Sequence, residues 1–254
     1  MNVDYNSLHK EWDTVHGEFG GPTYRLRKKI ILKLLRKVLR TRDYAHVLDV
    51  GCGTGEYTLA LARMHARVTA IDISSYALDK AQAQLRNEGI EDVSFQQVDG
   101  ACFETEERFD VIFLSEILEH IDDDYAFLKK YAEFLKNGGY ILCSFPFDPA
   151  LWSFEDEHAG HKRRYTMERV ESLIKSAGLC VDTLFCYGFP FLRTIWSVKV
   201  RKKSNYSFTE RKEYRKWMLF VRVICRMIAF CDSLYLKSRK GVGIILLAQK
   251  CVRV

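Results

Sequence analysis

The sequence predicts an α/β fold with a largely parallel sheet, and three observations lead to it. Short runs of β-branched and aliphatic residues alternate with helical stretches through the middle of the chain, which is typical of βαβ units. A glycine-rich turn follows the first of these runs. The 254 residues are 48% apolar and 28% charged with only 4 prolines, which excludes disordered and collagen-like chains. We expect a single domain over residues 1–254.

Taken in order, the elements begin with a helix over residues 24–39, where apolar side chains recur at helical spacing among basic ones. We expect this helix to pack against the edge of the sheet or over its mouth. Seven strands follow, at residues 47–50, 67–72, 93–98, 110–114, 140–145, 180–187 and 244–250. Helices are predicted at residues 56–65, 75–87, 124–135, 166–177 and 207–231. The last opens with the capping box Ser207-x-x-Glu210.

The strongest motif joins the first strand to the first helix of the sheet. It reads Val47-Leu48-Asp49-Val50-Gly51-Cys52-Gly53-Thr54-Gly55-Glu56. Glycines in such a turn permit a positive φ and let a ligand approach the backbone closely. Where a dinucleotide-binding turn has its last glycine, this chain has Glu56, whose negative charge suits a cationic ligand better than a pyrophosphate.

The segment from Asp49 to Gly55 resembles motif I of class I S-adenosylmethionine-dependent methyltransferases, and the resemblance extends over roughly residues 44–190 and the last strand. It implies a Rossmann-like seven-stranded sheet of order 3-2-1-4-5-7-6 with the seventh strand antiparallel. It also implies S-adenosyl-L-methionine as the methyl donor and S-adenosyl-L-homocysteine as the product. Within this fold we expect a core over 44–187 and 242–254, N-terminal lid helices over 1–43, and a cap insertion over 188–241.

The same resemblance implies a set of cofactor-binding residues. Asp72 would bind both ribose hydroxyls through charge-assisted hydrogen bonds, and Asp99 would meet the adenine amino group. The full predicted set is Asp49, Gly51, Cys52, Gly53, Gly55, Asp72, Ile73, Asp99, Gly100 and Ser115.

The residues after the fourth strand resemble the E-x-L-E-H segment of ubiquinone-type methyltransferases. Glu116, Glu119 and His120 occupy positions i, i+3 and i+4, which would place them on one face of a helical turn at the carboxyl edge of the sheet. Three interpretations stay open: a solvated capping turn, catalysis with His120 as a base or positioner beside Glu116, and ligation of a divalent metal, as some ubiquinone-pathway relatives are thought to do. We do not expect a metal.

A loop of about 20 residues follows the fifth strand and must start over the pocket. Its Asp156-x-x-x-Gly160-His161-x-Arg163-Arg164-Tyr165-Thr166 resembles a pattern of small-molecule methyltransferases linked to glycan, lipid or natural-product pathways. His161 is the first candidate for a catalytic base or a substrate hydrogen-bonding residue; the alternative is a histidine that only fastens the loop. The predicted substrate-binding residues are Trp12, His16, Tyr24, His158, Arg164 and Tyr165.

The basic residues are concentrated in one segment. Residues 193–240 hold 14 Lys and Arg against 3 acids, a net +11, whereas the rest of the chain is at -5 within a formal total of +6. An insertion between the sixth and seventh strands would leave and re-enter the sheet at its carboxyl edge and cap the substrate pocket. Such a cap would admit an amphiphilic or anionic substrate or contact anionic lipid headgroups; the alternative is a buried helix with a solvated basic face.

We expect methyl transfer to an oxygen of a small-molecule acceptor, a natural product, lipid or glycan intermediate. N- or C-methyl transfer, and a non-catalytic cofactor-binding scaffold, remain alternatives. We expect no nucleic-acid partner, because no recognition module appears. The first residues lack a signal-peptide pattern, and the 8 cysteines, without a C-x-x-C pair, are interpreted as reduced thiols. This favours a cytoplasmic protein with peripheral membrane contact through residues 193–240.

Overall fold

The computed structural model describes residues 4–16, 21–201 and 227–251, with the backbone alone for residues 12–16, 199 and 201. Seven strands form one sheet in the order β3-β2-β1-β4-β5-β7-β6, as predicted. Neighbouring strands are parallel except β7, which is antiparallel to both β5 and β6. The strands are β1 (His46–Val50), β2 (Arg67–Asp72), β3 (Val93–Gln97), β4 (Phe109–Ser115), β5 (Leu135–Pro146), β6 (Leu179–Tyr187) and β7 (Gly243–Lys250).

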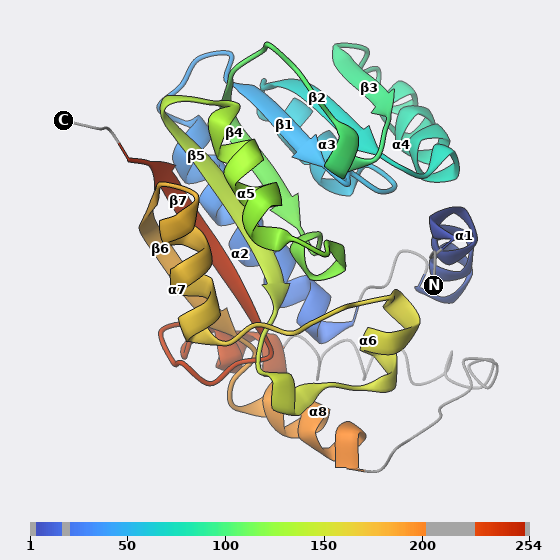
Figure 1. The fold of residues 1–254 in the computed structure, drawn as a ribbon. Coiled ribbons are helices and arrows are strands. Elements are labelled where there is room, and N and C mark those ends of the chain that lie inside the picture. The colour runs from blue at the N-terminus through green and yellow to red at the C-terminus, as the bar shows by residue number, and fades with distance from the viewer. Residues whose placement is uncertain (1–3, 17–20, 202–226, 252–254) are drawn as a thin grey trace.

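Helices cover both faces of the sheet, with α5 and α7 in front and α2 behind (Figure 1). The α-helices are α1 (Tyr5–His16), α2 (Pro22–Leu39), α3 (Glu56–Ala62), α4 (Ser75–Asn87), α5 (Asp124–Glu133), α6 (Phe154–Ala159), α7 (Met167–Ser176) and α8 (Phe191–Arg201). Short 3-10 turns are η1 (Gly100–Cys102), η2 (Leu118–His120) and η3 (Pro149–Leu151). Helix α2 packs on the face of the sheet over β5 and β7 and not at its edge, while its first turns line the cavity at the carboxyl ends of the strands. No described helix has both the length and the apolar run that crossing a bilayer requires.

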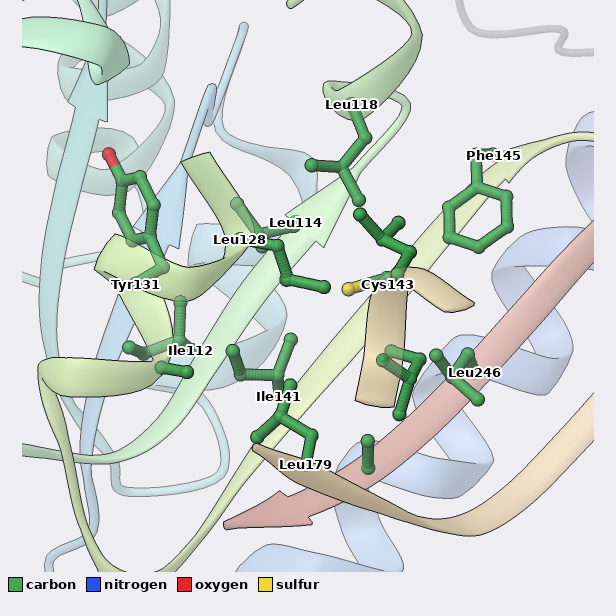
Figure 2. Close-up of a cluster of buried hydrophobic side chains, with 14 of the residues drawn as sticks. Ile112, Leu114, Leu118, Leu128, Tyr131, Ile141, Cys143, Phe145, Leu179 and Leu246 are labelled. Carbon is green, nitrogen blue, oxygen red and sulfur yellow. The ribbon is translucent and has the colours of Figure 1, made fainter. Parts of the chain in front are cut away.

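The core lies on both sides of the central strands. Along β4, Val111 and Phe113 face the α2 side while Ile112 and Leu114 face the α5 side, so the strand reads as one apolar run. Figure 2 shows the cluster on the α5 side of the sheet, where Ile112 and Leu114 meet Leu128 and other aliphatic side chains. Full burial of each such side chain stabilises the fold by about 1.5–3 kcal/mol. The carboxyl ends of these strands are therefore held rigidly.

Two expectations for the elements need correction, and a third falls mostly outside the described residues. The helix predicted over 124–135 ends at Glu133, because Leu135 already pairs with Phe109 at the start of β5. Helix α6 was not predicted, whereas α1 and α8 lie within the expected lid helices and cap insertion, for which no such bounds were predicted. Most of the helix predicted over 207–231 lies outside the described residues; its last part falls in a helix over 227–233.

The interpretation of all cysteines as reduced thiols is wrong for two of them. The structure joins Cys180 and Cys251 by a disulfide, although they are 71 residues apart in sequence. Strands β6 and β7 are antiparallel neighbours, and Cys180 lies opposite Gln249, so the pairing of the strands brings the two cysteines together. No local motif in the sequence reveals such a pairing.

Residues 188–241 leave and rejoin the sheet at one point. The Val242 N–H donates to the Tyr187 carbonyl over 2.8 Å, and Gly243 pairs with both Tyr187 and Pro146. Both oxygens of the buried Asp232 accept backbone N–H groups at the start of α8, from Phe191 and Leu192, over 2.9 Å each. Helix α8 is thus fixed beside the carboxyl ends of the parallel strands.

Candidate functional site

A cavity of about 2520 Å³ opens at the carboxyl ends of β1, β2, β4 and β5. The glycine turn after β1 forms one side, and η2, α6 and α8 contribute to the other. Helix α1 supplies a further wall. Open α/β sheets bind ligands at this edge, so the cavity is the candidate site.

The glycine turn is shaped by close packing. Gly55 has φ +85°, and a Cβ there would lie 2.7 Å from the Cβ of Ala81 in α4. The N–H groups of Gly51 and Cys52 both donate to the Ile71 carbonyl, over 2.8 and 3.0 Å. The turn therefore lies tightly between β2 and α4. Of the predicted cofactor-binding residues, all line the cavity except Gly55, which packs against Ala81.

Asp72 ties the turn to the next helix. One carboxylate oxygen accepts the Gly53 N–H and the other accepts the Ser74 N–H, each over 2.8 Å. Asp49 lies beneath the same turn and is buried, and its carboxylate accepts the Thr58 hydroxyl over 2.6 Å. Burial raises the pKa of Asp49 to about 7, the Thr58 hydrogen bond opposes this rise, and the neighbouring Asp72 adds to it.

Other predicted cofactor residues lie further along the cavity. Asp99 is exposed and caps η1 by accepting the Ala101 N–H over 2.8 Å. The Gly100 carbonyl accepts the Tyr131 hydroxyl over 2.9 Å, and Ser115 shares a 2.9 Å hydrogen bond with Ser144. Ile73 is partly exposed at the rim. Burial also raises the pKa of Glu56, which forms an ion pair with Lys28, to about 7.

Helix α1 closes the glycine-turn side of the cavity. The sequence predicted lid helices over 1–43 but not where this helix would lie. Asn6 accepts the Ser74 hydroxyl over 2.8 Å and the Tyr76 N–H over 3.2 Å, and so holds α1 against the start of α4. Tyr5, Leu8, His9 and Glu11 line the cavity. The side chains of Trp12 and His16, both predicted to bind substrate, lie outside the described residues. No sequence signal marks Asn6.

On the opposite side, His161 lies among acids. Its Nδ1 is 2.9 Å from Asp156 Oδ1, and its Nε2 is 3.9 Å from Glu119 Oε1. The rings of His120 and His161 meet edge to face, with centroids 4.9 Å apart. Glu119, His120 and His161 each offer one ligand-type atom, and these atoms lie within 4.8 Å of one another. The structure thus brings two of the predicted catalytic residues together, and it adds Glu119 and Asp156.

This cluster contains buried polar atoms without a protein partner among the described residues. Neither carboxylate oxygen of Glu119 has a hydrogen-bond partner, nor does Nδ1 of His120. Burial, reinforced by Glu116, raises the pKa of Glu119 well above its usual value. Burial, with a contribution from His161, lowers the pKa of His120 to about 4. His120 is therefore neutral near pH 7, and burial favours the protonated form of Glu119.

Glu116 departs from its expected place. It has φ +57° at the end of β4, and its carboxylate pairs with Arg27 and accepts the Ser144 hydroxyl over 3.0 Å. The turn η2 begins only at Leu118, so Glu116, Glu119 and His120 do not lie along one helical face. The expected common face is wrong, because the left-handed backbone at Glu116 separates it from the turn.

Some of the predicted substrate-binding residues line the cavity and others do not. Tyr24 lines the cavity beneath Arg27, and His158 lines it while pairing with Glu11 over 3.3 Å. Arg164 lines the cavity but is buried, donating to Asp156 over 2.9 Å and to the Phe147 carbonyl over 3.2 Å.

The prediction that Tyr165 binds substrate is wrong. The side chain is fully buried, its hydroxyl donates to Asp124 over 2.8 Å, and its ring packs against Phe145 at 4.5 Å between centroids. Its backbone forms a bridge with Phe147, which directs the ring into the core beneath α5 and α7. Tyr165 therefore fixes the loop from below.

Part of the chain is similar to known methyltransferases. Residues 47–139 match the family described as "Methyltransferase domain". The ubiquinone biosynthesis O-methyltransferase of Serratia proteamaculans is 29% identical over 151 residues, which cover 57% of this chain and 62% of that one. The chain thus spans less than two thirds of this curated relative.

Solved structures share the fold. A methyltransferase-like protein from Bacillus halodurans superposes with a TM-score of 0.62 at 20% identity, covering 87% of this chain and 99% of that one. The N-methyltransferase NodS from Bradyrhizobium japonicum, in complex with S-adenosyl-L-homocysteine, gives a TM-score of 0.57 at 18% identity, covering 89% and 88%. The similar proteins thus include both O- and N-methyltransferases.

Proposed function

The chain contains a class I S-adenosylmethionine-dependent methyltransferase domain, distantly related to ubiquinone biosynthesis O-methyltransferases, and we propose that it transfers a methyl group to an oxygen of a small-molecule acceptor. The observation that carries the proposal is the pair of His161 and Asp156 on the cavity wall. An imidazole held by a carboxylate can accept the proton that an acceptor hydroxyl releases.

The glycine-turn side of the cavity fits the proposed cofactor. The turn exposes backbone without Cβ atoms, and acids stand along it at Asp49, Glu56 and Asp72. Asp72 would bind the ribose hydroxyls and Asp99 the adenine amino group. When bound, S-adenosyl-L-methionine supplies an activated methyl group on a positively charged sulfur. The acids would favour this cation, and ligand alignment against His161 would supply the proximity that the transfer needs.

His161 would act as the base. Its Nε2 would take the hydroxyl proton of the acceptor as the acceptor oxygen gains the methyl group. The apolar residues Leu192, Ile195 and Trp196 of α8 line the same cavity and would hold an apolar part of the acceptor. We also propose α1 as a lid over the cofactor and residues 188–241 as a cap over the acceptor.

A matched pair of histidine variants tests the function. Removing a general base costs on the order of 10²–10⁴-fold in rate, so His161→Asn should lower kcat by this amount while calorimetric affinity for S-adenosyl-L-methionine stays within about threefold. His65→Asn is the control, since His65 is exposed outside the cavity at a φ of +60° that asparagine tolerates. Full activity in His161→Asn would contradict the role of His161.

The alternatives predict different outcomes of the same measurements. An amine acceptor that is already deprotonated needs a base less, so N-methylated products and a small His161→Asn effect would favour N-transfer. Cofactor binding without turnover over a broad panel of hydroxylated, amine and carbon acceptors would favour a non-catalytic scaffold.

The cluster of Glu119, His120 and His161 also has the donor types that suit a divalent cation, which would polarise an acceptor oxygen. We expect turnover to survive dialysis against EDTA. Loss of turnover that Mg²⁺ or Zn²⁺ restores would instead assign a metal to this cluster.

A second proposal concerns the membrane. Residues 193–240 carry a net +11, and α8 and the helix over 227–233 present an apolar outer surface. Its exposed members outside the cavity lining are Phe191, Val198, Met227, Phe230, Leu234 and Tyr235. We propose that this surface contacts anionic lipid, where each basic residue contributes about 1 kcal/mol.

Sedimentation with vesicles tests the membrane contact. Binding to phosphatidylglycerol vesicles at low salt, loss of binding at high salt, and weaker binding by Phe230→Glu are the expected results. Tyr44→Glu makes a matched change at an exposed aromatic outside this surface. Failure to bind anionic vesicles at low salt would remove the proposal.

A further inference from the structure

We infer that Asp156 is a positioning residue that fixes the proton of neutral His161 on Nδ1 and thereby presents the Nε2 lone pair to the cavity. The inference rests on the proposed function only for the use made of that lone pair. The placement of the proton itself follows from hydrogen bonds around Asp156.

Both oxygens of Asp156 already accept from groups that can only donate. Oδ1 receives the Arg164 Nε–H over 2.9 Å, and Oδ2 receives the Ser153 N–H over 2.8 Å. A guanidinium and a backbone N–H have no acceptor role. The carboxylate therefore acts as an acceptor on both oxygens, and His161 Nδ1, 2.9 Å from Oδ1, must be the donor.

The charge state of Asp156 agrees with this assignment. Burial would raise the pKa of Asp156, but hydrogen bonds from His161 and Arg164 and the Arg164 charge outweigh burial and hold it below its usual value. Asp156 is 1% exposed, so water does not compete for these contacts. A buried ionised carboxylate with fixed donors orients an imidazole firmly.

The local chain explains why these groups meet. Ser153 and Asp156 form a capping box at the start of α6. Gly160 ends this short helix with φ +75°, and the His161 N–H then donates to the Asp156 carbonyl over 2.9 Å. The ring of His161 is thus folded back onto the side chain of Asp156. The segment D-x-x-x-G-H thus orients the histidine ring through local contacts.

A second contact fixes the direction of Nε2. The Lys162 N–H donates to the Glu119 carbonyl over 2.8 Å and ties the loop to η2. Nε2 then lies 3.9 Å from Glu119 Oε1, beyond hydrogen-bond distance. An acceptor hydroxyl placed beside Nε2 would give its proton to Nε2 while its oxygen takes the methyl group of S-adenosyl-L-methionine. The carbon–sulfur bond would break with its electron pair left on sulfur, giving S-adenosyl-L-homocysteine, and solvent would then remove the proton from the imidazolium.

The direct test is the tautomer of His161 in the wild-type protein. Side-chain ¹⁵N chemical shifts at pH 8 distinguish protonated Nδ1 from protonated Nε2. We expect Nδ1–H in the free protein, with no ligand or turnover needed. A resting Nε2–H tautomer would overturn the inference, even if His161 later proves essential for activity.

Variants separate positioning from folding. Asp156→Asn should shift the tautomer toward Nε2–H and lower kcat by about 10²-fold or more, with KM and cofactor affinity within about threefold. Ser153→Ala removes the hydroxyl that donates to Asp156 Oδ2 over 3.0 Å and keeps the backbone N–H, and it should keep both tautomer and kcat. Unchanged tautomer and kcat in Asp156→Asn would also overturn the inference.

The proposed function fails by a different result. If His161→Asn retains turnover while wild-type His161 carries its proton on Nδ1, the base role is wrong and the positioning by Asp156 stands.

Discussion

The two halves of the cavity treat their polar groups differently. On the glycine-turn side, Asp72 accepts two backbone N–H groups and Asp49 accepts the Thr58 hydroxyl. On the His161 side, both oxygens of Glu119 and Nδ1 of His120 are buried without a partner among the described residues. Arg27 Nε and the Tyr57 hydroxyl are also buried without a hydrogen-bond partner among the described residues.

This contrast has an energetic meaning. Each buried polar group that lacks a hydrogen bond costs about 1–3 kcal/mol. The fold tolerates several such groups on one side of a single cavity and satisfies the carboxylates on the other. The carboxylates of Asp72 and Asp49 are therefore preorganised by the protein alone, whereas the buried polar atoms near His161 lack such partners among the described residues.

Removal of Asp72 should break the cofactor side most severely. Asp72→Ala loses the proposed ribose hydrogen bonds to a charged group, about 1.5–3 kcal/mol each, and loosens Gly53. We expect the Kd for S-adenosyl-L-methionine to rise by about 10²-fold or more in calorimetry, with Asp79→Ala, an exposed acid on α4, as the matched control. Equal affinities in the two variants would refute the assignment of Asp72.

Burial of Glu119 near His161 should make the free energy of unfolding depend on pH. Its raised pKa means that the folded protein retains a proton that the unfolded chain releases, so stability falls as pH rises above the usual glutamate range until the folded pKa is passed. The limit is about 1.4 kcal/mol per pH unit. Glu119→Gln cannot titrate, so its Tm relative to wild type should increase between pH 5 and 8. Parallel Tm curves would contradict this.

A smaller effect is expected from Asp49. Its pKa of about 7 leaves it partly protonated at neutral pH, and a cationic ligand favours the ionised form. Affinity for S-adenosyl-L-methionine should therefore increase from pH 6 to 8, by at most about tenfold per unit. Asp49→Asn should flatten most of this dependence, with Glu56, also raised to about 7, accounting for the remainder. A dependence unchanged in Asp49→Asn would exclude Asp49 as its source.

The smallest effect is expected from Tyr165→Phe, which tests whether Tyr165 supports the loop or contacts the substrate. Tyr165→Phe removes the hydroxyl that donates to Asp124, at about 1 kcal/mol. A Tm decrease of about 2–4 °C is expected for a chain of this size, with kcat/KM within twofold. An altered KM for the acceptor would return Tyr165 to the substrate site.

The position of the glycine turn and its acids at one edge of the sheet could be predicted because its signals are local. A strand, a glycine turn and an acid at the end of the next strand recur at short spacing, and strand order followed from the resemblance. The His161 side depends on contacts between distant segments. Glu119 Oε1 lies 3.9 Å from Nε2 of His161, in a loop that is distant in the sequence. On the glycine-turn side, the contact of Asn6 with Ser74 across 68 residues was missed for the same reason.

Within one motif, the sequence also could not tell support from function. His161 and Tyr165 lie four residues apart, yet one ring lines the cavity and the other is buried against Phe145. The direction of each ring depends on the left-handed Gly160 and on the backbone bridge from Tyr165 to Phe147. Neither feature leaves a periodic pattern. The positive φ at Glu116 was hidden for the same reason.

The hydrogen-bonded contact between Tyr187 and Val242 has a consequence for engineering. Because the two ends of residues 188–241 already touch, a replacement of different length adds little closure entropy, about 0.6 kcal/mol for each doubling. The segment can therefore be exchanged between homologues while the strands that hold the methyl donor stay in register. If residues 188–241 cover the acceptor as proposed, such an exchange would change acceptor preference separately from donor binding.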